Sequence, residues 1–181
     1  MARSLEKDQI DWGDLIGRNL SGTYFFAQAV AKHMVQSGGG HIVNVSSKMA
    51  ASTAPSSAYC AAKAGIVALS AAEWARHGIR VNCLAPGVLA TDAMQQMIGN
   101  LDAGDLLQEC LTARTPVGRL GTVEEVAVAV AFLASGESDF LTGSTLFVDG
   151  DWTPYGDYTG WGFVRSLLSH DLNQRTEPTA R

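Results

Sequence analysis

The sequence predicts an α/β fold in which helices alternate with parallel strands. Apolar residues recur at helical spacing over residues 11–36, and short β-branched runs follow at 41–46 and 79–85. A third such run, at 145–148, comes after a further apolar helix. Helices and strands that alternate along a chain form parallel sheets with right-handed crossovers. Because such sheets bind ligands at the carboxyl ends of their strands, we expect functional residues directly after the predicted strands.

Each predicted helix has its own local pattern. The first helix ends at the glycines 38–40 and carries an apolar face at three- and four-residue steps, formed by Leu15, Leu20, Tyr24, Ala27, Ala31 and Val35. An alanine-rich helix is predicted from Ala58 to His77, where Gly78 ends it. Thr122 and Glu125 form a capping-box pattern ahead of a helix that runs to Ala134. Between these helices we expect one short helix near Asp102–Cys110.

Composition excludes several function classes. The chain has 181 residues with 46% apolar and 17% charged residues, which is the balance of one globular domain. A net charge of −5 argues against a nucleic-acid partner. No apolar run approaches the ~20 residues that cross a bilayer, and the N-terminus has no secretory pattern, so we expect a cytoplasmic protein without a membrane partner. The odd, widely spaced cysteines and the histidines show no ligand spacing, so no metal site is predicted.

Tyr59 and Lys63 are the first candidates for catalysis. Their four-residue spacing places them on one face of the predicted helix, one turn apart. An ammonium group close to a phenol favours the tyrosinate form, so such a tyrosine can exchange a proton with a carbonyl or alcohol oxygen. Taken alone, the pair could equally be an ordinary helix surface.

Three further positions gather around this pair. Ser47 follows the first strand, Asn19 interrupts the first helix, and Pro86–Gly87 with Thr91 follow the second strand. Each also has a structural interpretation: a turn serine, an asparagine at a helix bend, and a threonine that caps a short helix.

Together these residues resemble the short-chain dehydrogenase/reductase family. The resemblance covers about residues 10–150 in the family's order, and each of its motifs is weak alone. It is carried by N-L-S-G-T (19–23), G-G-H-I-V-N-V-S-S (39–47), A-Y-C-A-A-K-A-G (58–65), H-G-I-R-V-N-C-L-A-P-G (77–87), P-V-G-R-L-G-T-V-E-E-V-A (116–127), F-L-A-S (132–135) and L-T-G-S-T-L-F-V-D-G (141–150).

The resemblance implies an oxidoreductase that exchanges a hydride between NAD or NADP and a small alcohol or ketone. It implies that Tyr59 is the general acid/base, that Lys63 lowers its pKa and binds the nicotinamide ribose, and that Ser47 orients the substrate oxygen. Asn19 resembles the residue that holds a water in the proton relay. The cofactor-binding set that it implies is Tyr59, Lys63, Pro86, Gly87 and Thr91.

The chain departs from the family pattern at its N-terminal side. The family's first βαβ unit, with its T-G-x-x-x-G-x-G phosphate turn, has no counterpart here, so we expect the carboxyl-terminal portion of a doubly wound, Rossmann-like sheet with the cofactor half missing. Binding of the cofactor by this chain alone is therefore doubtful. The strand at 42–45 would then be a bare parallel edge. A glycine pattern at 156–162 lacks a preceding strand, and we interpret it as part of an aromatic tail instead.

Two local departures concern the site. Ser47 lies twelve residues before Tyr59, whereas the commonest family spacing of thirteen would select Ser46. We favour Ser47, because the second serine of the pair is usually the catalytic one and the following loop tolerates a deletion. Between Ser70 and Trp74, the helix that begins at Ala58 is about one turn shorter than in the family. This would rotate the helix face after that point by roughly 60°.

The sequence thus predicts a partial catalytic domain at 1–150 and a tail at 151–181 that is first aromatic and then polar. Two functions stay open. One is a homo-oligomeric, NAD(P)-dependent short-chain dehydrogenase/reductase. The other is a catalytically inactive fragment of that family that retains only a dimerisation surface.

Overall fold

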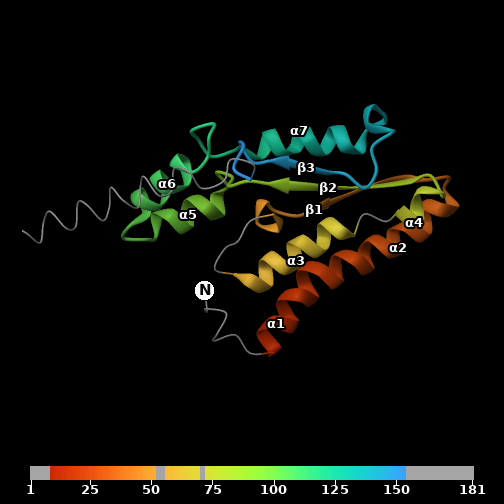
Figure 1. The fold of residues 1–181 in the computed structure, drawn as a ribbon, viewed down its shortest axis with the longest axis horizontal. Helices are drawn as coiled ribbons and strands as arrows, with labels where there is room; N and C mark the ends of the chain where they lie inside the picture. The colour runs from red at the N-terminus through yellow and green to blue at the C-terminus, as the bar shows by residue number, and fades with distance from the viewer. Residues whose placement is uncertain (1–8, 52–55, 70–71, 154–181) are drawn as a thin grey trace, which may run out of the picture.

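The fold is a three-stranded parallel sheet with helices on both of its faces (Figure 1). The structure, a computed structural model, describes residues 9–51, 56–69 and 72–153. The predicted parallel α/β fold is confirmed. Its strands, in spatial order, are β1 (Gly40–Val45), β2 (Ile79–Pro86) and β3 (Thr145–Val148).

The helices form two layers and a cap. One face of the sheet is covered by α2 (Gly22–Gln36) and α3 (Ser57–Ala68), and the other by α7 (Val123–Ala134) (Figure 1). Beyond the carboxyl ends of the strands lie α5 (Asp92–Gly99) and α6 (Gly104–Ala113). The short elements are α1 (Gln9–Ile16), η1 (Gly17–Ser21), η2 (Lys48–Ala50), α4 (Ala72–Ala75) and η3 (Gly136–Ser138).

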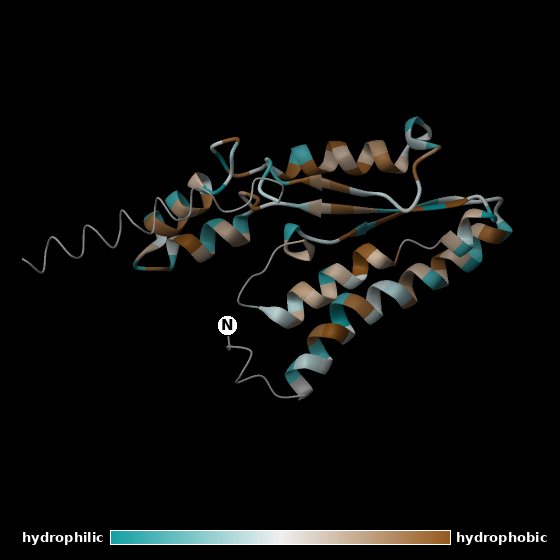
Figure 2. Cartoon of the chain, in the orientation of Figure 1, coloured by the Kyte–Doolittle hydropathy of each residue, from teal (hydrophilic) through white to brown (hydrophobic). Residues whose placement is uncertain are grey.

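The central strand β2 forms the core of the sheet. Its residues from Ile79 to Ala85 are all buried, as expected for a parallel strand that is covered on both faces. Figure 2 shows apolar residues on the strands and on α7. Val45 pairs with Leu84 and Pro86 pairs with Val148, so the carboxyl ends of the three strands meet at one edge. Among the described strands β1 has a neighbour on one side only, as predicted for the 42–45 segment.

The predicted helix from Ala58 to His77 is wrong as a single element. Helix α3 ends at Ala68 and α4 begins at Ala72, with residues 70–71 outside the described part of the chain. If the predicted helix were continuous and one turn shorter than in the family, Trp74 would be rotated to the wrong angle for packing against the core. As a separate helix, α4 lets Trp74 pack against the core cluster of Ala31, Ile79 and Val81.

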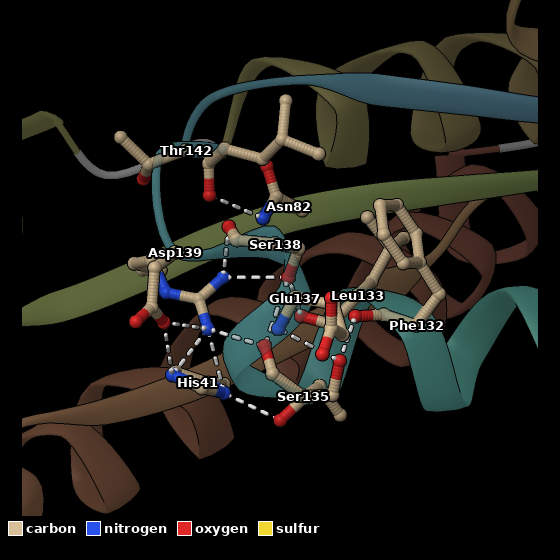
Figure 3. A network of polar contacts seen from close by, with 12 residues as sticks. His41, Asn82, Phe132, Leu133, Ser135, Glu137, Ser138, Asp139 and Thr142 are labelled. Atoms are coloured by element: carbon tan, nitrogen blue, oxygen red, sulfur yellow. Dashed lines mark hydrogen bonds and ion pairs between the residues drawn. The ribbon is translucent and has the colours of Figure 1, made fainter.

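A polar network ties the amino-terminal ends of the strands together, and Figure 3 labels His41, Ser138 and Asp139 among its residues. Arg80, only 9% exposed, donates hydrogen bonds to the carbonyl oxygen of Ser138 (2.6 Å) and to its hydroxyl (2.8 Å). It also donates to the carbonyl oxygen of Ser135 (2.9 Å), pairs with Asp139 (3.2 Å) and contacts His41. The network closes the loop after α7 onto β1 and β2, at the edge opposite the candidate site.

The predicted capping box at the start of α7 is confirmed. The Thr122 hydroxyl accepts from the Glu125 amide (3.2 Å), and the Glu125 carboxylate accepts from the Thr122 amide (2.8 Å). Arg119 forms a salt bridge with the same carboxylate, through two hydrogen bonds (2.9 and 2.5 Å).

These contacts predict a pH dependence. The guanidinium of Arg119, followed by the Thr122 amide, lowers the pKa of Glu125 to about 2. A lowered carboxyl pKa stabilises the fold above the unfolded value of ~4.3, and this contribution is lost as the pH falls toward the folded value. We expect Arg119→Ala to raise the Glu125 pKa toward ~4.3, measured by NMR titration of the side chain. An unchanged pKa would show that the backbone amide alone holds the carboxylate.

Within the described ranges, no helix is both long and apolar enough to cross a bilayer. The same ranges contain no group of three or more histidine, cysteine or acidic side chains placed to hold a metal ion.

Candidate active site

The polar segments that follow the strands meet at the carboxyl edge of the sheet. Ser46 and Ser47 follow β1, Gly87 follows β2 and Asp149 follows β3. Helix α3 packs against both β1 and η2, so the Tyr59–Lys63 turn begins beside this edge. The topology therefore brings together the strand-end residues that the sequence placed apart.

Tyr59 and Lys63 lie on consecutive turns of α3. The ammonium nitrogen of Lys63 is 5.6 Å from the centre of the Tyr59 ring, as their spacing predicts. The same nitrogen donates a hydrogen bond to the carbonyl oxygen of Val45 (3.1 Å), which is the last residue of β1. Burial lowers the pKa of Lys63, and the Cys83 thiol acts in the opposite direction. Lys63 thus joins the helix to the strand end, with its charged group close to the phenol.

The two serines after β1 have different environments. Ser46 is buried, and its hydroxyl donates to the carbonyl oxygen of Lys63 (2.7 Å), which fastens α3 to the sheet. Ser47 is half-buried, and its oxygen accepts from the Met49 amide (3.2 Å) as the cap of η2. A hydroxyl that accepts one hydrogen bond can still donate its own hydrogen. The structure therefore assigns Ser46 a packing contact and leaves the Ser47 hydroxyl able to donate to a substrate oxygen.

Asn19 lies in the π-helical turn η1 between α1 and α2. Its side-chain amide nitrogen donates to the backbone carbonyl of Leu15 (3.1 Å), and its backbone carbonyl oxygen accepts from the Thr23 hydroxyl (2.7 Å). The predicted helix over residues 11–36 is therefore present but contains this wider turn. The Leu20 side chain is in contact with Gly65 of α3, so η1 packs next to the turn that carries Lys63. Single π turns are frequent at functional sites.

The segment after β2 makes a close backbone approach. The Gly87 amide donates to the Val148 carbonyl (2.9 Å), and a β-carbon on Gly87 would lie 2.7 Å from the Asp149 α-carbon. Thr91 caps α5, since its hydroxyl oxygen accepts from the Met94 amide (3.2 Å). The capping alternative for Thr91 is thus present in the structure, and a contact with a cofactor stays a prediction.

The close approach at Gly87 predicts the effect of a single methyl group. We expect Gly87→Ala to lower the free energy of unfolding by about 1–3 kcal/mol, because the methyl group meets backbone atoms that cannot rotate away. Thermal unfolding of the chain measures this change. Gly13→Ala in α1 is the control, since a β-carbon there meets nothing within 4 Å and alanine favours a helix by about 0.5–1 kcal/mol. Equal stabilities of the two variants would contradict the steric argument.

A cationic cluster, formed by Lys48, Arg114 and Trp152, also lies at this edge. The Lys48 nitrogen is 2.7 Å from the centre of the Trp152 ring, and the Arg114 guanidinium carbon is 4.7 Å from the same centre. This cluster was not predicted from the sequence, although a lysine directly after Ser47 could have drawn attention to it. The glycine pattern at 156–162 lies outside the described residues.

Comparison with known proteins identifies the family. A family model described as enoyl-(acyl carrier protein) reductase matches residues 1–153. A solved structure described as a short chain dehydrogenase/reductase family protein is 37% identical, with a TM-score of 0.74 over 84% of this chain and 62% of that chain. The chain belongs to the short-chain dehydrogenase/reductase family.

Other relatives of this short-chain dehydrogenase/reductase act on sugar acids by name. Gluconate 5-dehydrogenase of Gluconobacter oxydans is 40% identical over 144 residues, which are 77% of this chain and 55% of the relative. The crystal structure of a gluconate 5-dehydrogenase from Burkholderia cenocepacia, in complex with NADP and tartrate, is 39% identical with a TM-score of 0.77. That match covers 84% of this chain and 60% of the solved one. The chain thus spans less than two thirds of the length of the relatives it matches.

Proposed function

We propose that this short-chain dehydrogenase/reductase transfers a hydride between a nicotinamide cofactor and a small alcohol or ketone, as a homo-oligomer in the cytoplasm. The observation that carries the proposal is the Tyr59–Lys63 pair, one helical turn apart and fastened to the end of β1. The relatives at about 40% identity, one of them with NADP bound, support the same reaction type.

In the proposed mechanism the chain handles the proton. During oxidation of an alcohol, the Tyr59 phenolate accepts the hydroxyl proton while the carbinol carbon loses its hydride. The chemistry that NAD or NADP would supply, when bound, is a hydride acceptor. Ser47 donates a hydrogen bond to the reacting oxygen and holds it near the phenol, and the Lys63 ammonium stabilises the phenolate form. In the reverse direction Tyr59 returns the proton to the oxygen of the ketone.

The residues at the carboxyl edge fit the nicotinamide end of such a cofactor. Lys63 offers ammonium hydrogens to a ribose hydroxyl, and Gly87 lies in the backbone segment directly after β2, at the same edge of the sheet. We therefore propose Lys63, Tyr59, Pro86, Gly87 and Thr91 as the cofactor contacts. Asn19 is proposed to hold a water of the proton relay through the wider turn in which it lies.

A second candidate function is a binding module of the same family without turnover. The observation that favours it is the surface beside the open edge of β1. A groove of about 410 Å³ lies between α2 and β1, and Phe25 and Phe26 of α2 are 62% and 74% exposed. Such a surface suits assembly with another polypeptide.

Cofactor binding separates the two candidates. We expect NADP or NAD to raise the melting temperature of the 181-residue chain in a concentration-dependent manner, because a ligand that binds only the folded state stabilises it. Reduction of NADP in the presence of gluconate then tests turnover. A melting temperature that does not change at saturating concentrations of either cofactor would favour the binding module.

The adjacent serines provide a matched pair for the mechanism. We expect Ser47→Ala to lower turnover by about tenfold or more with an unchanged melting temperature, because it removes a hydrogen bond to the reacting oxygen. Ser46→Ala should instead lower the free energy of unfolding by about 1 kcal/mol, since it breaks the contact with the Lys63 carbonyl. The reverse pattern would assign the catalytic hydroxyl to Ser46, which stands at the commoner family spacing.

A further inference from the structure

Strand β1 bonds to β2 through every second residue. The Gly40 amide donates to the Gly78 carbonyl oxygen (3.1 Å), and the Ser46 amide donates to the Leu84 carbonyl oxygen (2.7 Å). Between these two bonds the residues of the two strands pair one to one. In a parallel pair the backbone groups of alternate residues face the partner strand. The even-numbered residues of β1 therefore point their amides toward β2.

The odd-numbered residues of β1 point their backbone groups the other way. They are His41, Val43 and Val45, and none of the described strands lies on that side. The Val45 carbonyl oxygen accepts from the Lys63 ammonium group (3.1 Å), so one of these groups is engaged within the chain. The outward amides are groups of the kind on which a further strand can pair.

An apolar groove runs along the same edge. It has a volume of about 410 Å³ and lies between residues 41–45 of β1 and a face of α2 that includes Phe26, Val30 and Met34. The Phe26 side chain is 74% exposed, and Val45 is 51% exposed. A strand that paired with β1 could cover these apolar side chains while its backbone bonded to the outward amides.

The direction of the existing strands indicates what fits this edge. The described strands of the sheet all run parallel, and purely parallel sheets occur more often than a random mixture of directions would give. A second copy of this chain, related by a two-fold axis, would present its own β1 in the antiparallel direction. A parallel strand from a different polypeptide therefore suits the edge better.

The relatives contain polypeptide that could supply such a strand. This chain spans only 55% of the Gluconobacter oxydans relative and 60% of the solved Burkholderia cenocepacia enzyme, with which it shares its fold. The remainder of each relative lies outside the match. Elements of one domain pack on a common core, so an open strand beside an apolar groove is a surface on which that remainder could pack.

We propose that the open edge of β1 binds a second polypeptide, which corresponds to the part of these relatives outside the match and pairs with β1 through a parallel, apolar strand. The added strand would bond to the amides of Val43 and Val45 and cover Phe26. Because parallel strands end at the same edge of a sheet, the loop after it would lie beside Ser47. The inference rests on the second candidate function, the binding module, and names its partner.

Amide hydrogen exchange of the full chain, followed by NMR, tests this docking. The probe is the longest segment of the Gluconobacter oxydans relative outside the match, prepared as a separate polypeptide. Its addition should slow exchange of the Val43 amide by at least about tenfold, because that amide gains a hydrogen-bond partner. The Asn44 amide faces β2 and should change less. Unchanged exchange at Val43 with the probe in excess would overturn the inference.

Three variants locate the binding at this edge. Val43→Pro removes an outward amide but no bond to β2, and it should weaken binding of the probe by at least about tenfold in isothermal titration. Phe26→Ser removes an exposed ring from the groove and should weaken binding similarly at an unchanged melting temperature. Phe140→Ser is the matched control, because this exposed ring lies after η3 and outside the groove. Equal affinities of all three variants would overturn the inference.

The remaining outcomes separate this inference from its alternatives. A chain that sediments as a dimer, and that Val43→Pro converts to a monomer, would assign the edge to a second copy and overturn the inference. A chain that binds the probe at Val43 but reduces NADP with gluconate without it would contradict only the binding module. A chain without turnover in which the probe leaves Val43 unprotected would contradict only the strand docking.

Discussion

Replacing Tyr59 by phenylalanine is expected to reduce hydride transfer by about 10²–10⁴-fold, the usual contribution of a positioned general acid/base. The substitution removes one oxygen and leaves the ring where Lys63 packs against it. The proton of the reacting alcohol would then have no acceptor at this position. The fold should be retained, because the backbone contacts of α3 with β1 pass through Ser46 and Lys63 rather than through the phenol.

The rate of cofactor reduction at saturating substrate measures this loss, with circular dichroism as the check on folding. Tyr24→Phe is the matched control: this tyrosine lies on α2, and its hydroxyl accepts from the Gln28 side-chain amide (3.3 Å). Losing that contact should leave turnover unchanged. Full activity in Tyr59→Phe would remove the acid/base assignment, and equal losses in both variants would point to a general structural effect.

Replacing Arg80 by alanine is expected to be the most destabilising of the substitutions considered. The buried guanidinium donates to two carbonyl oxygens and a hydroxyl, and it pairs with Asp139 at the amino-terminal end of the sheet (Figure 3). Removing it leaves these acceptors without their donor, and the two on Ser138 are buried. Such losses lower the free energy of unfolding by about 3–5 kcal/mol.

Thermal unfolding should show this as a fall in melting temperature of roughly 10 °C, since about 2–4 °C accompany each kcal/mol in a domain of this size. Arg119→Ala serves as the control, because that arginine makes a bidentate pair with Glu125 on an exposed surface. Exposed pairs contribute little, so its melting temperature should change slightly. Comparable losses in the two variants would show that the Arg80 network does not anchor the strands.

Most of the fold could be predicted from local pattern. The third strand lies at Thr145–Val148 as expected, the first is displaced from its predicted position by one residue, and the second is one residue longer than predicted. These segments were predictable because β-branched runs between turn residues have few other conformations. The break between α3 and α4 was not, because alanine-rich sequence favours a helix throughout, whereas the contact of Trp74 with the core cluster is tertiary.

Part of the candidate site could be predicted from the sequence, and part could not. The Tyr59–Lys63 contact follows from helix geometry alone, since four residues make about one turn. The choice between Ser46 and Ser47 depends on where each side chain points after β1, which spacing does not determine. Lys48 meets Trp152 across about a hundred residues of sequence. Contacts of this kind exist only once the sheet has brought its strand ends together.

The wider turn at Asn19 determines which side chains of α1 face α3. In this turn the Gly22 amide bonds to the Gly17 carbonyl, five residues back, so one extra residue is accommodated between α1 and α2. Each residue of a regular helix turns the chain by about 100°, so this insertion rotates the side chains of α1 by about that angle relative to those of α2. Leu15 and Ile16 are consequently half-buried, and α1 packs on α3. Deleting a single residue of this turn would rotate Leu15 and Ile16 away from α3. The turn of α3 that carries Tyr59 would then lose its cover.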